Sequence, residues 1–167
     1  MKLPIFRYVS DIGELHVLIV TVVDPPADVR EGLVKGIDAD VYVVLDSSTA
    51  PMDNDLVYYM YLALRSHMQG LGMAKDVNME ALALSECTTQ IGEAKRRANV
   101  SGARLLTVAA SSIGRDPEVK VDFRGLDYLI GSSTRFRKPR CSRGDVLLMY
   151  VNRLRRGGSV IKGVSVG

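Results

Sequence analysis

The chain has 167 residues, the size of one ordinary domain, and its 47% hydrophobic and 25% charged residues support a buried core and exclude a disordered protein. No apolar run approaches the about 20 residues of a membrane-spanning helix, and the first residues lack the apolar stretch and cleavage site of a secretory signal, so we expect a cytoplasmic protein. The net charge is only +3, which excludes a strongly basic or acidic protein as a whole.

The N-terminal part of the chain predicts a strand pair, a helix and a third strand. Residues 3–9 and 14–23 have strand character, and the turn between them contains Gly13. Asp24 and the two prolines after it open a helix that ends at Gly36. The apolar run 41–45 then predicts a buried strand.

The longest predicted helix covers residues 53–69. Its residues 56–64 are nine apolar residues in a row, so the helix must be covered on more than one side. The cover could come from the same domain or from another protein chain.

Two more helices and a strand follow, over residues 77–84, 88–99 and 104–110. Glu80 is the only charge in the first of these helices, and Asn99 can end the second because asparagine tolerates left-handed backbone. Strands and helices are interleaved without strict alternation. This order predicts an α+β (mixed α/β) fold, one domain over residues 1–167 with a mixed central sheet packed by several helices.

The C-terminal segment, residues 124–167, is basic and of uncertain structure. It carries 10 Lys and Arg against 2 Asp and Glu, whereas residues 1–123 carry 12 against 17. It contains a basic loop at 135–143, a predicted helix at 145–155, and a late strand or loose tail at 160–166. Such a segment either contacts polyanions or forms an ordinary solvated surface.

The motifs of common enzymes are missing. The sequence has no dinucleotide-binding fingerprint, Walker loop or nucleophile elbow. Cys87 and Cys141 match no zinc spacing, so they are two free thiols or, in a protein from a hyperthermophile, a disulfide. Asp46 and Ser47 follow a strand, where they are turn formers or mark a small nucleotide-using enzyme. We expect no metal and no cofactor.

Three stretches together resemble a known family. They are Asn-Met-Glu-Ala-Leu-Ala-Leu at residues 78–84, Gln-Ile-Gly-Glu-Ala at 90–94, and the strand at 104–110. This arrangement resembles the small regulatory subunit of the KEOPS complex, the family of the p53-related-kinase-binding protein. The resemblance covers about residues 24–112.

The resemblance implies a non-catalytic role in the synthesis of threonylcarbamoyladenosine, a tRNA modification. Members of the family bind the atypical kinase-like ATPase of the complex, and archaeal members help to hold the 3′ CCA end of tRNA. Transferred to this chain, the kinase interface would include Met79, Glu80, Leu82 and Leu84.

Two clusters of cations are candidates for the tRNA contact. Lys95, Arg96 and Arg97 are consecutive on one predicted helix and therefore point in different directions. The basic loop adds Arg135, Phe136, Arg137, Lys138 and Arg140. Cations beside an aromatic ring are typical of sites for unpaired nucleotides. The alternatives are a stand-alone RNA-binding protein and the small nucleotide-using enzyme.

Overall fold

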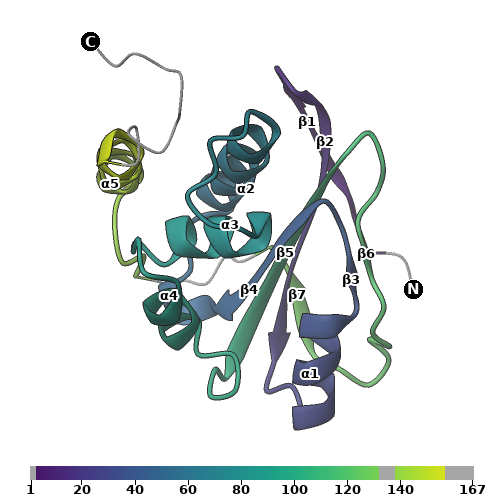
Figure 1. Ribbon diagram of the computed structural model, residues 1–167. Helices are drawn as coiled ribbons and strands as arrows, with labels where there is room; N and C mark the ends of the chain where they lie inside the picture. Colours follow the sequence, from purple (N-terminus) through teal and green to yellow (C-terminus); the bar gives the residue numbers. More distant parts are fainter. Residues whose placement is uncertain (1–2, 132–137, 157–167) are drawn as a thin grey trace.

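An antiparallel sheet built around one long strand organises the fold (Figure 1). The computed structural model describes residues 3–131 and 138–156. Its elements in chain order are β1 (Phe6–Ser10), β2 (Gly13–Val23), α1 (Ala27–Lys35), β3 (Ile37–Asp38), β4 (Val41–Asp46), a 3₁₀ turn (Ser47–Thr49), α2 (Asp53–Met68), α3 (Val77–Ser85), α4 (Ile91–Ala98), β5 (Leu105–Ile113), β6 (Glu118–Val119), β7 (Tyr128–Ile130) and α5 (Arg143–Arg156).

The strand order of the main sheet is β1-β2-β5-β4, and every pairing in the described part of the chain is antiparallel. β5 pairs with residues 15–23 of β2 and so occupies nearly all of one edge of this strand. β1 and β7 therefore share the other edge: β1 pairs with the first half of β2, and β7 pairs with its second half. β3 and β6 form a separate two-stranded ladder.

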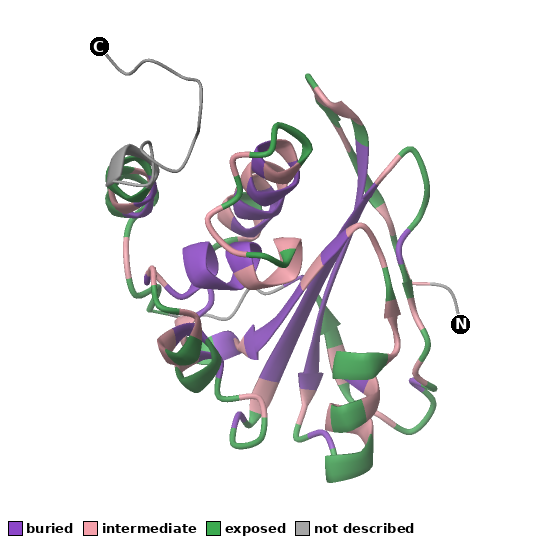
Figure 2. Ribbon diagram, in the orientation of Figure 1, coloured by how far each residue is buried: buried purple, intermediate pink, exposed green. Residues whose placement is uncertain are grey.

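The central strand β2 is buried on both faces, which explains its long apolar run (Figure 2). Alternate residues point to opposite faces of a sheet. Leu15, Val17 and Ile19 belong to the core under α2, α3 and α4. Leu18 and its neighbours two and four residues on belong to the core on the opposite face, which includes Leu33 of α1.

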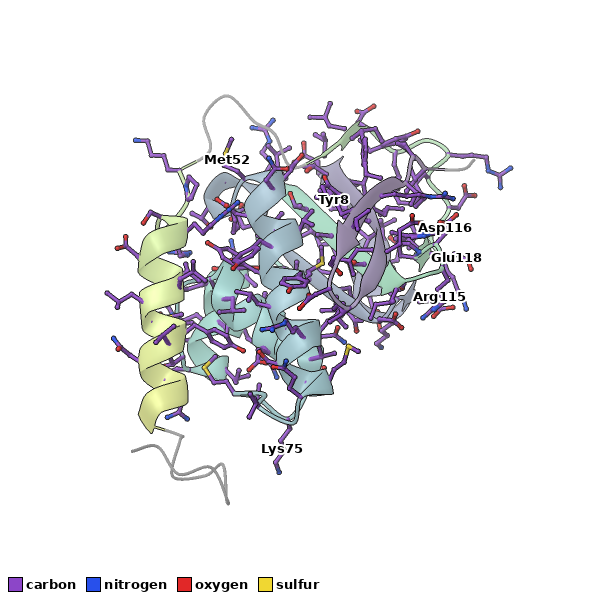
Figure 3. All side chains as sticks on the ribbon, turned by 90° about the horizontal axis from the view of Figure 1, so that it is seen from above. Tyr8, Met52, Lys75, Arg115, Asp116 and Glu118 are labelled. Carbon is purple, nitrogen blue, oxygen red and sulfur yellow. A yellow bond between two sulfur atoms is a disulfide. The ribbon has the colours of Figure 1, made fainter. Side chains whose placement is uncertain are left out.

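Helix α2 is covered from two sides within the same chain. It packs on the sheet through residues such as Leu56 and Met60, which are fully buried. On its outer side, Tyr59 packs together with Val146 and Tyr150 of α5. Figure 3 shows α5 lying beside the other helices. This cover satisfies the apolar stretch predicted to need more than one neighbour.

The sequence-based expectation of an α+β domain with a central sheet and several packed helices is confirmed. The sheet was expected to be mixed, but every described pairing is antiparallel. The predicted hairpin and the predicted helices lie within a few residues of the observed ones. None of the helices in the described residues is long and apolar enough to cross a membrane. The possible late strand at 160–166 lies outside the described residues.

The two cysteines are joined by a disulfide, so the free-thiol interpretation is wrong. Cys87 follows α3 and Cys141 precedes α5, and their Cα atoms are 6.1 Å apart. They are 54 positions apart in the chain, so no local pattern signals this pairing. The bridge fastens the start of α5 to the end of α3.

Candidate binding groove at the edge of the sheet

A large groove follows the free edge of β4. Its volume is about 870 Å³, and we call it the β4-edge groove. One wall is α1, the floor is β4, and the opposite wall is formed by α3 and α4. Its lining residues are Ala27, Arg30, Glu31, Val34, Lys35, Tyr42, Val43, Val44, Asn78, Met79, Leu82, Lys95, Arg96, Asn99, Val100 and Ser101.

The groove exists because β4 is an edge strand. β4 pairs with β5 on one side, and the backbone N–H of Tyr42 points the other way, where it donates to the side-chain oxygen of Asn78 at 2.8 Å. In an antiparallel ladder, residues two apart direct their backbone groups to the same side. Val44 therefore directs its N–H and C=O toward the groove, where they can pair with an extended ligand.

The surface of the groove combines apolar and cationic side chains. Val34 on α1 is 38% exposed, and Met79 and Leu82 on α3 contribute further apolar surface. Lys95 and Arg96 on α4 are exposed at the opposite wall. An apolar centre with a charged rim is typical of surfaces that bind macromolecules.

The cations at the rim differ in their partners. Arg96 pairs with Glu93, and the bonds from Arg96 and then Arg97 lower the pKa of Glu93 to about 2. Lys35 pairs with Glu31 at 2.6 Å. Lys95 makes no ion pair with a described residue, so its charge is available to a ligand.

The structure separates the residues predicted to contact tRNA. Lys95 and Arg96 line the groove, and Lys138 is exposed. Arg97 and Arg140 instead make internal contacts. Arg135, Phe136 and Arg137 lie outside the described residues.

Arg140 neutralises a buried carboxylate. Glu86 is fully buried, and its side chain accepts a hydrogen bond from Arg140 at 3.1 Å. Burial raises the pKa of Glu86, and the bond from Arg140 opposes part of this rise. Arg97 donates to the backbone carbonyls of Glu86 and Cys87 at 2.9 and 3.1 Å. Both arginines thus hold the end of α3, and their contact with tRNA stays a prediction.

The residues predicted to contact a kinase also differ in their exposure. Met79 and Leu82 line the groove. Glu80 and Leu84 are 0% exposed and cannot touch a partner directly, so their assignment to an interface is wrong. Leu84 packs in the core beside α5.

Glu80 has a structural role that its isolation in an apolar helix did not reveal. Its carboxylate accepts hydrogen bonds from the backbone N–H groups of Met73 and Ala74, and it lies 3.2 Å from Nε2 of His67. Burial raises the pKa of Glu80, while these donors and His67 act in the opposite direction. It holds the loop between α2 and α3.

Sequence reasoning missed the α1 wall of the groove. Val34 and Lys35 are 45 and 44 positions from Met79 in the chain and belong to no motif. These residues line one groove with Met79 because α1 and α3 lie on opposite faces of the sheet, beside the same edge strand. The usable signal was only that an open sheet must have an edge strand on each side.

The polar residues after β4 are engaged in a turn. The side chain of Asp46 accepts bonds from the N–H and hydroxyl of Ser48, and Ser47 is fully buried. Both histidines are paired with carboxylates, since His16 contacts Glu14 at 2.8 Å and His67 contacts Glu80. The described residues contain no cluster of His, Cys, Asp and Glu that could hold a metal ion.

No protein-family model matches the chain, and a comparison with curated proteins finds no significant match.

Proposed function

We propose that the protein is a non-catalytic, partner-binding subunit of the KEOPS type, which binds the kinase-like ATPase and helps to recruit the 3′ CCA end of tRNA. The observation that carries this proposal is the β4-edge groove. It joins apolar residues that the family resemblance assigns to the kinase with cations that the charge pattern of the sequence makes candidates for a tRNA contact.

Apolar side chains and an open strand edge make the groove suitable for a protein partner. Val34, Met79 and Leu82 supply apolar contact area from both walls. The backbone groups of Val44 offer hydrogen bonds to an added strand. Contacts of this kind give an interface affinity without any catalytic group.

The cations at the rim suit the phosphates of RNA. Lys95 lines the groove and has no ion pair with a described residue. Lys138 does not line the groove; it is exposed beyond the end of β4, where its backbone N–H donates to the backbone carbonyl of Ser48. Each phosphate that a lysine neutralises adds affinity through counterion release, and this part of the affinity falls with salt.

The small nucleotide-using enzyme is the weaker alternative. Glu86 is a perturbed carboxylate and is influenced by Asp46, as an active site at the end of β4 would require. However, Glu86 is fully buried and already bonded to Arg140, so no substrate can reach it. The same residues are explained by the anchoring of α3.

The RNA part of the proposal is tested with Lys95→Glu and Lys138→Glu, alone and together. We expect each change to weaken tRNA binding and to reduce the slope of log affinity against log salt by about 1. Lys75→Glu is the matched control, because Lys75 is exposed on the loop between α2 and α3, does not line the groove and is not one of the predicted tRNA contacts. Figure 3 shows its side chain pointing away from the body of the protein. Equal effects of all three changes, or equal binding of tRNA with and without its CCA end, would contradict the proposal.

The protein part is tested by capturing partners from the native organism with the tagged full chain. We expect an atypical kinase-like ATPase and a carbamoyl-transferase, and we expect Val34→Glu to abolish their capture. Leu148→Glu is the control, because Leu148 is 62% exposed on α5, a helix that contributes no residue to the groove. Tight RNA binding without any kinase would favour a stand-alone RNA-binding protein.

A further inference from the structure

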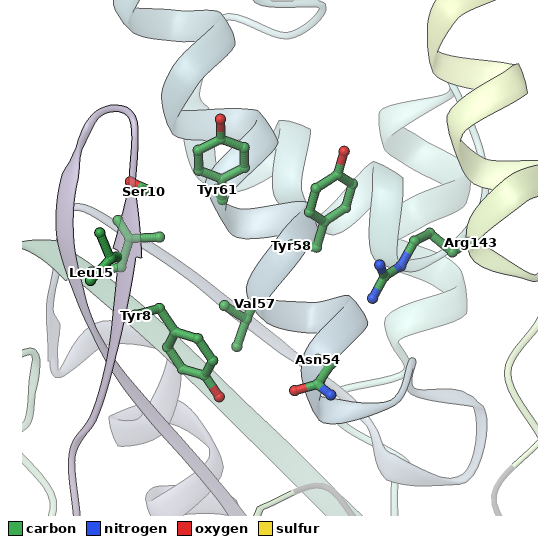
Figure 4. Close-up of a pocket in the computed structure, with 9 residues that line it drawn as sticks. Tyr8, Ser10, Leu15, Asn54, Val57, Tyr58, Tyr61 and Arg143 are labelled. Atoms are coloured by element: carbon green, nitrogen blue, oxygen red, sulfur yellow. The ribbon is translucent and has the colours of Figure 1, made fainter.

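A second cleft lies between the β1–β2 hairpin and α2 (Figure 4). Its volume is about 460 Å³, and it shares no lining residue with the β4-edge groove. We call it the tyrosine cleft. It is lined by Tyr8, Leu15, Val57, Tyr58 and Tyr61, with Asn54 and Arg143 at its rim.

Three half-buried tyrosine rings from two elements surround the cleft. Tyr58 and Tyr61 of α2 have ring centroids 5.9 Å apart and are tilted by 32°, so they do not stack flat on each other. Tyr8 comes from β1 on the opposite wall, and Val57 lies between the walls in Figure 4. Aromatic walls around an aliphatic floor offer a planar ligand contact on its faces.

The walls are held in place by contacts across the rim. The hydroxyl of Tyr61 donates to Asp11 in the hairpin turn, and Arg65 of α2 donates to the same carboxylate at 2.9 Å. The guanidinium of Arg143 lies 5.0 Å from the ring centroid of Tyr58, on the side away from Tyr8 (Figure 4). A site that is ordered before binding loses less entropy when its ligand enters.

The charges around the cleft are balanced. Arg143 pairs with Asp55 at 2.6 Å, and Arg65 pairs with Asp11. Neither cation is therefore a strong phosphate site. The amide of Asn54 makes no side-chain hydrogen bond with a described residue, and it can offer both a donor and an acceptor.

We propose that the tyrosine cleft binds a nucleobase, either of a free nucleoside or nucleotide or of an unpaired nucleotide in RNA. Its volume falls in the range of small-ligand sites. Stacking on the tyrosine rings gives the affinity, and the amide of Asn54 reads an edge of the base. The inference goes beyond the proposed function, because it needs neither the kinase partner nor the cations of the β4-edge groove.

Nuclear magnetic resonance on the full chain with labelled tyrosine rings tests the site directly. We expect adenosine to shift the ring signals of Tyr8, Tyr58 and Tyr61. Adenosine and adenosine monophosphate should bind with equal affinity, and added salt should not change that affinity, because the site recognises no phosphate. Absence of these shifts with adenosine, with adenosine monophosphate and with a short single-stranded RNA would overturn the proposal.

Single-residue variants then measure how much the rings contribute and which ligand source is used. We expect Tyr8→Ala and Tyr58→Leu to weaken binding of the bound probe about 5- to 100-fold, whereas Tyr58→Phe keeps the ring and the affinity. Phe6→Ala is the matched control, because Phe6 is a 49% exposed aromatic residue on the same strand as Tyr8 and does not line the cleft. An equal loss in the control and cleft variants would refute the site.

Comparison of the probes distinguishes a free nucleoside from an unpaired nucleotide in RNA, and both from a peptide ligand. Tighter binding of the RNA than of adenosine indicates an unpaired nucleotide in RNA, and equal binding indicates a free nucleoside. Shifts caused by a proline-rich peptide but not by adenosine would contradict the proposal, because tyrosine-lined grooves also bind such peptides. The cleft variants should leave kinase capture intact, so a failed cleft and a failed KEOPS-type function give different results.

Discussion

Replacement of Arg140 by alanine tests whether this arginine anchors the fold or serves a surface. Its partner Glu86 is 0% exposed, while the side chain of Arg140 is 33% exposed. Loss of one partner from a buried ion pair costs about 3–5 kcal/mol. Solvent already screens part of this pair, so we expect Arg140→Ala to lower the free energy of unfolding by about 2–3 kcal/mol.

Urea denaturation at several pH values, with the disulfide intact, measures this loss. The raised pKa of Glu86 means that the folded protein holds the proton more tightly than the unfolded chain. This carboxyl therefore costs stability as the pH rises from its ordinary value near 4.5 through its raised folded-state pKa. Without Arg140 the pKa of Glu86 rises further, so the deficit of the variant should shrink toward acid pH.

Two further variants complete the test. Glu86→Gln in the Arg140→Ala background should recover much of the stability at neutral pH, because no charge is then buried. Arg124→Ala is the control: Arg124 pairs with Asp122 on the surface, where the side chains are 88% and 59% exposed, and its loss should leave the free energy of unfolding almost unchanged. An Arg140→Ala variant as stable as this control, or one whose deficit does not change with pH, would refute the structural role of Arg140.

Three other changes have expected outcomes that the same unfolding assay checks. Joint replacement of Cys87 and Cys141 by serine should lower stability by about 4 kcal/mol, because the bridge closes a span of 54 residues; a loss that reductant does not reproduce in the wild type would count against this. Arg30→Ala should cost about 2 kcal/mol, since Arg30 donates to three backbone carbonyls, and a neutral change would mean that solvent replaces them. Asn99→Val should lower the free energy of unfolding by about 1–2 kcal/mol and Asn99→Gly should hardly change it, because Asn99 has a left-handed backbone with φ 50°. Equal effects of the two changes would show that this backbone conformation is unimportant.

The positions of most elements were predictable because they depend on neighbouring residues. The apolar run at 41–45 became β4, and the helix that contains Ile91 ends at Asn99, whose left-handed conformation was expected. For the candidate site, the same reasoning found residues of α3 and α4 but not those of α1. Helical spacing cannot tell that Met79 faces a groove while Glu80, the next residue, is fully buried.

The local pattern of apolar, turn and capping residues by itself determined an α+β domain with a buried hairpin strand and an apolar central helix. The tertiary structure alone decided which strand forms the open edge, that α1 joins α3 and α4 around it, and that Tyr8 meets Tyr58 and Tyr61. It also decided that Arg140 neutralises Glu86 and that the two cysteines form a bridge. The physical reason is that secondary structure responds to a few neighbouring residues, whereas these contacts join residues that are tens of positions apart and become neighbours only when the sheet and helices pack.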